Sequence, residues 1–350
     1  MAVHAKLAVV VAFALTSLST VVVALRFYSR YFLVGKLGSP DWMMLFALIS
    51  TWGCTVVNYY QIHFLDYSHV YSLETFEPVA VGALLTMWIY RLNYIFDHCL
   101  IKTSILLFYN YVASSHKAFH LIVRTLIVII VATSFGMAMA SIFICRPVSD
   151  SWSFSVFMDG FKGIYASQCY DPTILWLFNA GFNLATDSII WILPIPFVLN
   201  LRSMPVKRRL ELVAIFSIGI LAIVASAVRL YVITQWLSNW NNQGANTSNL
   251  LIWSQVEQHA GIISGSIPFL RPLVRKAMRG AKARERHPSP SPAAKLIQPQ
   301  ITPDNPMHQR TPIIPSPVPT VGSDREFRAP LSPLSPISPM RPEIYAVTTV

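Results

Sequence analysis

Six charged side chains lie inside long apolar segments of the sequence, where charges are energetically costly. A single charge at the centre of a membrane helix costs about 2.5–3.5 kcal/mol even on the mildest insertion scale. Three of the six are basic and three are acidic, so the set can neutralise itself. We therefore expect these charges to pair inside the protein or to line a wet cavity. The six residues are Arg91, Asp97, Lys102, Asp187, Arg229 and Glu257.

The depth of each charge along its segment indicates which charges can meet. At 1.5 Å of helical rise per residue, Glu257 and Arg229 each lie roughly 10 Å below the same membrane boundary, and Arg91 lies at a similar level. We therefore predict an outer layer in which Glu257 meets Arg229 and Arg91. The opposite charges offset the cost of burying any one of them.

A second group of polar residues lies nearer the midplane. Asp97 and Asp187 lie deeper than Glu257, and Lys102 is close enough to reach them, so we predict a middle layer of these three residues. Asn179, Asn183 and Asp187 recur every four residues, which places them along one helix face that must point into a bundle rather than into lipid. Two roles stay open for both layers: ion pairs that hold helices together, or the lining of a ligand or ion site.

Composition places these charges in a membrane protein. Hydrophobic residues make up 54% of the 350 residues and charged residues only 12%, about half the charge of an ordinary soluble domain. The mean hydropathy is +0.49, and several apolar runs reach the ~18–20 residues that span a hydrocarbon core. The net charge of +11 does not indicate nucleic-acid binding, because the basic residues crowd into short loops and the tail without interleaved aromatics.

The apolar runs predict an all-α, polytopic fold, a seven-transmembrane helix bundle. The first run could instead be a signal peptide with Lys6 as its positive flank, but its length and the lack of a small-residue cleavage site favour a retained helix. The expected spans are about 7–25, 41–64, 80–112, 121–144, 173–200, 210–236 and 250–270.

Lys and Arg residues collect in alternate loops, which predicts the orientation. The loops near 26–36, 117–124 and 202–209 and the segment after 271 are basic, whereas the loops near 66–77 and 150–171 carry the acids. The positive-inside rule then places the N-terminus outside and the C-terminus in the cytosol. Residues 1–276 would form the membrane domain. Residues 277–350 are rich in Pro and Ser and would form a disordered cytosolic tail.

The outer loops contain two further candidate features. Cys145 and Cys169 lie between the fourth and fifth spans and can form a disulfide in an oxidising compartment; two free thiols are the alternative. Asn246 begins the triplet Asn-Thr-Ser, a glycosylation acceptor, in the expected outer loop before the last span.

Small residues spaced by four recur in two spans. Gly261 and Gly265 form one set, and Ala132, Gly136 and Ala140 form the other. Such spacing lets helices approach closely. We interpret both sets as packing within the bundle rather than as dimer contacts.

Several motifs, in the order in which they occur, resemble the fungal rhodopsin-domain family of seven-helix membrane proteins. The matching stretches are "KTSILLFYNY", "CRPVSDSW" with a later Cys, "NLATDSIIWILPIPFVLNL", "SAVRLY" and "IWSQVEQHAGIISGSIPFLRPLV". The family includes receptor-like members and members of secondary-metabolite gene clusters, such as the satratoxin-cluster type. The resemblance covers roughly residues 20–275.

The resemblance implies which residues recur in the family. They are the polar residues Lys102, Asp187, Arg229 and Glu257, the outer-loop cysteines Cys145 and Cys169, and the prolines Pro194, Pro196, Pro268 and Pro272. Two departures are visible. The stretch after the second span, "YYQIHFLDYSHV", lacks the glycines typical of the family, and the chain lacks the cysteine-rich outer domain of some receptor-like relatives.

We expect no retinal despite the family's name. A retinal protein needs a buried lysine to form a Schiff base. The seventh span contains no lysine, and Lys102 on the third is the only lysine placed deep in a span. We therefore expect no cofactor and no visible absorption band.

The sequence favours a receptor-like sensor of an unknown small-molecule ligand. The expected partners are the lipid bilayer, that ligand and a cytosolic signalling protein, with the plasma membrane as location. The alternative is a transporter or an accessory membrane protein of a fungal secondary-metabolite pathway, although no internal repeat supports transport. We do not expect an enzyme, because no metal-spaced cluster, nucleotide loop or nucleophile motif occurs.

Overall fold

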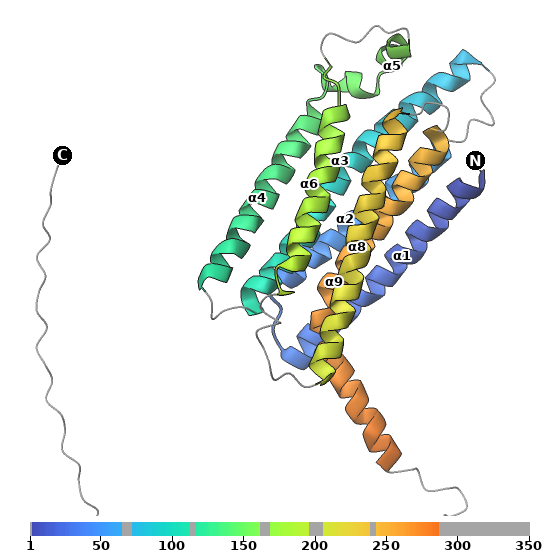
Figure 1. Cartoon of the computed structure of the whole chain (residues 1–350). Helices are drawn as coiled ribbons and strands as arrows, with labels where there is room; N and C mark the ends of the chain where they lie inside the picture. The colour runs from blue at the N-terminus through green and yellow to red at the C-terminus, as the bar shows by residue number, and fades with distance from the viewer. Residues whose placement is uncertain are drawn as a thin grey trace, which may run out of the picture. The chain divides into compact units, whose positions relative to one another are not determined.

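Long helices dominate the structure of the protein, a computed structural model shown in Figure 1. The structure describes residues 2–64, 72–112, 117–161, 169–195, 206–238 and 243–286, which lie within one compact unit. Outside the described residues lie Pro196, part of the loop after the second span, and the part of the expected tail (277–350) that follows residue 286. Within them, the helices of 20 residues or more are α1 (Ala2–Tyr28), α2 (Ser39–Phe64), α3 (Leu73–Val112), α4 (Lys117–Ile142), α6 (Thr173–Ile192), α8 (Val206–Ser238) and α9 (Gln243–Arg286).

Five of these helices are long and apolar enough to cross a membrane. They are α2, α3, α4, the second half of α8, and α1 together with the π-helix η1 (Ser29–Val34) that continues it. This confirms the expected all-helical membrane protein. The remaining two long helices, α6 and α9, are the ones that carry Asn179, Asn183, Asp187 and Glu257, and such residues lower the mean hydropathy of a helix.

Helices α3 and α9 form the centre of the bundle. Helix α9 packs against α1, α2, α3 and α8, and α3 also packs against α2, α4 and α6. Figure 1 shows the long helices side by side, with the far end of α9 projecting beyond the others. Helix α9 continues to Arg286, past the boundary expected at residue 276.

Close helix approach at α9 depends on two glycines. A Cβ atom added at Gly261 would lie 2.9 Å from Ile101 Cγ2, and one added at Gly265 would lie 2.9 Å from Ile105 Cγ1 and 3.0 Å from Met44 Cε. The predicted packing role of these two glycines is therefore confirmed.

The set of small residues on α4 is different. A Cβ atom added at Gly136 would meet nothing within 4 Å in the described residues, and Ala132 and Ala140 are exposed as well. The prediction that this set packs within the bundle was wrong. Spacing shows that residues share a helix face, but not whether a neighbouring helix covers that face.

The first helix extends further than its apolar run indicated. Arg26 was expected in a basic loop, yet it lies within α1 and its side chain is fully buried. Its Nε atom donates to Oδ1 of Asp41 at 2.9 Å, and Nε of Arg30 donates to Oδ2 of the same carboxylate at 3.2 Å. Removing Arg26 from the loop weakens, without reversing, the charge bias that predicted the orientation.

The opposite end of the bundle carries the disulfide. Cys145 and Cys169 are bonded, which confirms the predicted bridge over two free thiols. The segment between them includes the 3-10 helix η3 (Val148–Trp152) and the short helix α5 (Phe154–Phe161). At the start of α6, the backbone amide of Thr173 donates to Oδ1 of Asp171 at 3.0 Å, and this hydrogen bond lowers the pKa of the exposed Asp171 carboxyl group.

The glycosylation triplet is helical rather than part of a loop. Asn246 lies in the first turn of α9 and is half-buried, and Ser248 is 3% exposed with its hydroxyl donating to the carbonyl oxygen of Gly244. The expected loop position was wrong, because α9 begins at Gln243, earlier than its apolar run. Glycosylation at Asn246 itself stays a prediction.

Candidate functional site

Four helices bring their polar side chains to one place inside the bundle. These residues are buried or half-buried, and together we call them the central polar cluster. Its members are Tyr94 and Lys102 from α3, Asn183, Thr186 and Asp187 from α6, Ser226 and Arg229 from α8, and Glu257 from α9.

Glu257 receives contacts from all three of the other helices in the cluster. Arg229 Nε lies 2.9 Å from Oε2 of Glu257, and the Tyr94 hydroxyl donates to the same oxygen at 2.9 Å. The other oxygen, Oε1, accepts hydrogen bonds from the Asn183 amide and the Ser226 hydroxyl. The side chains of Glu257 and Arg229 are 1% and 5% exposed. The predicted pairing of these two residues is confirmed, and it explains how a carboxylate can be buried within α9.

Lys102 forms the second ion pair of the cluster. Its Nζ atom lies 3.1 Å from Oδ1 of Asp187 and donates to Thr186 Oγ1 at 2.7 Å. It also donates to the backbone carbonyl oxygen of Asn183 at 3.1 Å and to the side-chain oxygen of that residue. An ammonium group has three protons, so the donor capacity of Lys102 is fully used. The predicted pairing of Lys102 with Asp187 is confirmed.

Asn183 and Ser226 join the two ion pairs. The Asn183 amide donates to Glu257 while its oxygen accepts from Lys102. The Ser226 hydroxyl lies 2.9 Å from Oδ2 of Asp187 and also contacts Glu257. The cluster is therefore one connected network, in which a change at either ion pair reaches the other through a single side chain.

Two of the expected members lie elsewhere. Arg91 does not meet Glu257: its Cζ atom lies 3.9 Å from the ring centre of Trp176 on α6, a cation–π contact. Asp97 does not meet Lys102: its carboxyl group faces Thr51 on α2. The depth argument ignored direction around the helix. Asp97 and Lys102 are five residues apart on α3, so their side chains point roughly 140° apart.

A second polar group surrounds His259 on α9. Its Nδ1 atom lies 2.8 Å from Ser19 Oγ on α1, and its Nε2 atom lies 3.0 Å from Gln255 Oε1 and 3.2 Å from Thr16 Oγ1. Within the described ranges, no group of three His, Cys, Asp or Glu residues is placed to hold a metal ion.

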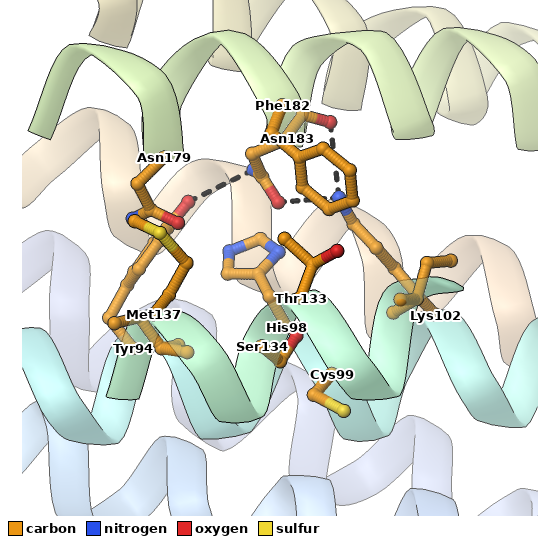
Figure 2. A pocket seen from close by; sticks show the side chains of 12 residues that line it. Tyr94, His98, Cys99, Lys102, Thr133, Ser134, Met137, Asn179, Phe182 and Asn183 are labelled. Atoms are coloured by element: carbon orange, nitrogen blue, oxygen red, sulfur yellow. Dashed lines mark hydrogen bonds between the residues drawn. The ribbon is translucent and has the colours of Figure 1, made fainter. Parts of the chain in front are cut away.

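A small pocket adjoins the central polar cluster between α3, α4 and α6 (Figure 2). It shares Tyr94, Lys102 and Asn183 with the cluster, and His98, Thr133 and Asn179 also line it. The space holds about one or two water molecules. The Nε2 atom of His98 is buried without a hydrogen-bond partner among the described residues. A small polar molecule there would therefore find an unused donor or acceptor.

Sequence reasoning missed three members of the cluster, Tyr94, Thr186 and Ser226. Their types carry no charge, and such residues are common in membrane helices. Position alone was the available signal: Tyr94 lies eight residues before Lys102 on the same face of α3, and Ser226 lies three residues before Arg229 on α8.

Comparison with known proteins agrees with this architecture. Residues 25–276 match the family described as the fungal rhodopsin domain. The chain therefore belongs to the fungal rhodopsin-domain family of membrane proteins.

Two curated relatives are informative. The polyenoic acids biosynthesis gene cluster protein Ba17b of Metarhizium anisopliae is 25% identical over 272 residues, which cover 75% of this chain and 71% of that protein. The receptor GIN3 of Arthrobotrys oligospora is 29% identical over 267 residues, which cover 74% of this chain and 60% of the receptor. No solved structure matches the chain.

The residues present do not fit retinal, the group that the family's name suggests. A Schiff base needs a free lysine amine, whereas Lys102 Nζ is paired with Asp187 and donates to Asn183 and Thr186. The adjoining pocket has room for about one or two water molecules, far less than a polyene needs.

Proposed function

We propose that this chain is a receptor-like sensor of a small ligand and that it acts without retinal. The observation that carries the proposal is the convergence of α3, α6 and α8 on one carboxylate, Glu257 of α9, directly beside a pocket. The relative named as a receptor supports the proposal. Because the alignment spans only 60% of that receptor, its function does not transfer as a whole.

The proposed mechanism follows from the shared lining of pocket and cluster. A ligand that contacts Asn183 or Tyr94 competes with hydrogen bonds that reach Glu257. It thereby favours one arrangement of the helices over another, in proportion to its different affinity for the two. The change is transmitted along α9, the helix that extends furthest from the bundle (Figure 1).

The proposal includes seven crossings, an outer N-terminus and the plasma membrane. Helices α6 and α9 bury polar side chains inside the bundle, among them Asn183 and Glu257 of the central polar cluster, so their low hydropathy is compatible with a membrane environment. Helix α5, which lies between the two bonded cysteines in the chain, is at the end of the bundle opposite the basic extension of α9 (Figure 1). This arrangement is expected if the disulfide is in an outer loop and the extension of α9 is cytosolic. A cytosolic signalling protein would contact that basic end.

A second candidate is supported by the relative named after a polyenoic acid biosynthesis cluster. In this alternative the chain is a transporter or an accessory membrane protein of a metabolite pathway, and the buried ion pairs hold the bundle together. In either case we propose a role other than catalysis, because the sequence has no metal-spaced cluster, nucleotide loop or nucleophile motif.

A ligand screen on the purified full chain in lipid nanodiscs tests the sensor proposal. Compounds that raise the melting temperature should lose this effect in Asn179→Ala, which alters the pocket, and keep it in Gly136→Ala, which is exposed and meets nothing. The same compounds should trigger a response in cells that express the chain. A compound that binds without a response, but whose flux across proteoliposomes is lost in Asp187→Asn, would favour transport instead. Disruption of the gene with metabolite profiling tests the pathway role.

The absence of retinal is tested in the same sample. Purified protein given retinal should show no visible absorption band. A band that disappears in Lys102→Ala would contradict the proposal.

A further inference from the structure

Asp97 is a buried carboxyl group without a cation. It lies on α3 and is fully buried. Its two oxygens lie 3.1 and 3.2 Å from one atom, Oγ1 of Thr51 on α2. Among the described residues, no Lys, Arg or His lies within ion-pair distance of it.

Three other carboxylates inside the described part of the bundle each have a cation. Asp41 is paired with Arg26 and Arg30, Asp187 with Lys102, and Glu257 with Arg229. Each of these ion pairs offsets the cost of removing a charge from water. These three carboxylates are each neutralised by a cation on a neighbouring side chain, whereas Asp97 has no such cation among the described residues.

The hydroxyl of Thr51 explains how Asp97 is held. This oxygen lies 2.8 Å from the carbonyl oxygen of Ala47, closer than it lies to either carboxyl oxygen of Asp97. A hydroxyl has one proton and two lone pairs, and the bond to the carbonyl four residues earlier is the usual one for a helical threonine. With its proton directed to Ala47, Thr51 can only accept a hydrogen bond from Asp97, and that requires a proton on the carboxyl group.

The neighbours of Asp97 that the structure describes supply no ion pair to its carboxyl group. Two titratable groups of the described residues that interact electrostatically with Asp97 are the Cys54 thiol on α2 and the Tyr90 hydroxyl on α3, and both are uncharged at neutral pH. From α9, the amide of Gln258 donates to Cys54. Arg91, six residues before Asp97 on α3, lies over Trp176. An ionised Asp97 would be an uncompensated charge, which costs several kcal/mol in a dry interior.

We propose that Asp97 is a proton-binding site that is occupied in the resting bundle. The carboxyl O–H donates to Thr51, and the Thr51 hydroxyl donates to Ala47. Loss of this proton requires water or a cation to enter between α2 and α3, so the protonation state of Asp97 is linked to the contact between these helices. The inference does not depend on the receptor-like role.

Infrared spectroscopy of the full chain in nanodiscs tests the proposal. A protonated carboxylic acid has a C=O stretching band apart from the bands of ionised carboxylates. This band should be present at neutral pH, should shift in D2O, and should disappear in Asp97→Asn. Asp187→Asn is the matched control and should keep the band, because Asp187 is paired with Lys102.

Stability gives a second readout. Asparagine resembles the neutral acid, so Asp97→Asn should keep the wild-type melting temperature, whereas Glu257→Gln should lower it. Thr51→Val removes the acceptor, and the Asp97 band should then shift as its hydrogen bond is lost. If Asp97→Asn fails to fold, the Thr51→Val shift still decides the matter.

Two results would overturn the proposal. One is a C=O band that is the same in wild type, Asp97→Asn and Thr51→Val. The other is a wild-type melting temperature that is higher in a sodium salt than in a choline salt, with no such difference in Asp97→Asn. That result would show that the site holds a metal cation rather than a proton.

Discussion

Arg26 on α1 and Asp41 on α2 form an ion pair in which both side chains are completely buried. The same guanidinium group donates from Nη1 to the carbonyl oxygen of Gly265 and lies 3.8 Å from the ring centre of Phe269, both on α9. Pro268 has no N–H to donate to the carbonyl oxygen of Ser264, four residues earlier in α9, and the Arg26 hydrogen bond lies one residue further along, at Gly265. Arg26 thus connects three helices beside the proline of α9.

Removal of Arg26 is expected to destabilise the bundle strongly. Arg26→Met leaves Asp41 with only Arg30 and removes the hydrogen bond that Arg26 donates to the Gly265 carbonyl oxygen. Breaking one partner out of a buried pair costs about 3–5 kcal/mol. Unfolding of purified protein measures the loss. Arg124→Met, at an exposed position on α4, is the control and should behave as wild type.

The Glu257–Arg229 pair should show strong coupling. Glu257→Gln and Arg229→Met each leave a buried partner without its counter-charge, so the double variant should lose less than the sum of the two single losses. Residues in direct contact couple by about 0.5–3 kcal/mol. Folded yield and the free energy of unfolding, measured for all four proteins, give the coupling. Additive losses would show that the ion pair does not stabilise the bundle.

A methyl group at Gly265 is expected to disturb the packing of α9. In Gly265→Ala the new Cβ atom lies 2.9 Å from Ile105 and 3.0 Å from Met44, and overpacking of this kind costs about 1–3 kcal/mol. Gly136→Ala makes no such contact and should be neutral or slightly stabilising. A comparison of melting temperatures checks both, and equal effects would contradict the assigned helix contacts.

Loss of the disulfide should lower stability without changing the helical content. Cys145 and Cys169 are separated by 24 residues, and a bridge that closes a loop of this size contributes about 3 kcal/mol. Cys145→Ser with Cys169→Ser should melt at a lower temperature and show the same far-ultraviolet circular dichroism as wild type. Cys54→Ser is unsuitable as a control because Cys54 is buried; Cys99→Ser, at a half-buried free cysteine, should leave the bridge intact on non-reducing gels.

Apolar periodicity and depth predicted much of this arrangement, and their failures have a common cause. Glu257 and Arg229 were paired correctly because their helices run in opposite directions and both residues lie at one level. Asp97 and Arg91 were misplaced because depth fixes only one of the two coordinates of a residue on a helix. Arg26 was placed in a loop because its helix continues past the end of the apolar run. Its ion pair with Asp41 was therefore not predicted.

The contacts of Glu257 also constrain how the family can diverge. Its two oxygens contact Tyr94, Asn183, Ser226 and Arg229. Replacing the acid would therefore leave donors on three helices without their acceptor. Relatives that lack a carboxylate here are expected to have exchanged several of these positions as a linked set. During evolution, the residues that contact Glu257 would then be substituted together, whereas residues on the exposed surface of α4 would be substituted independently of one another.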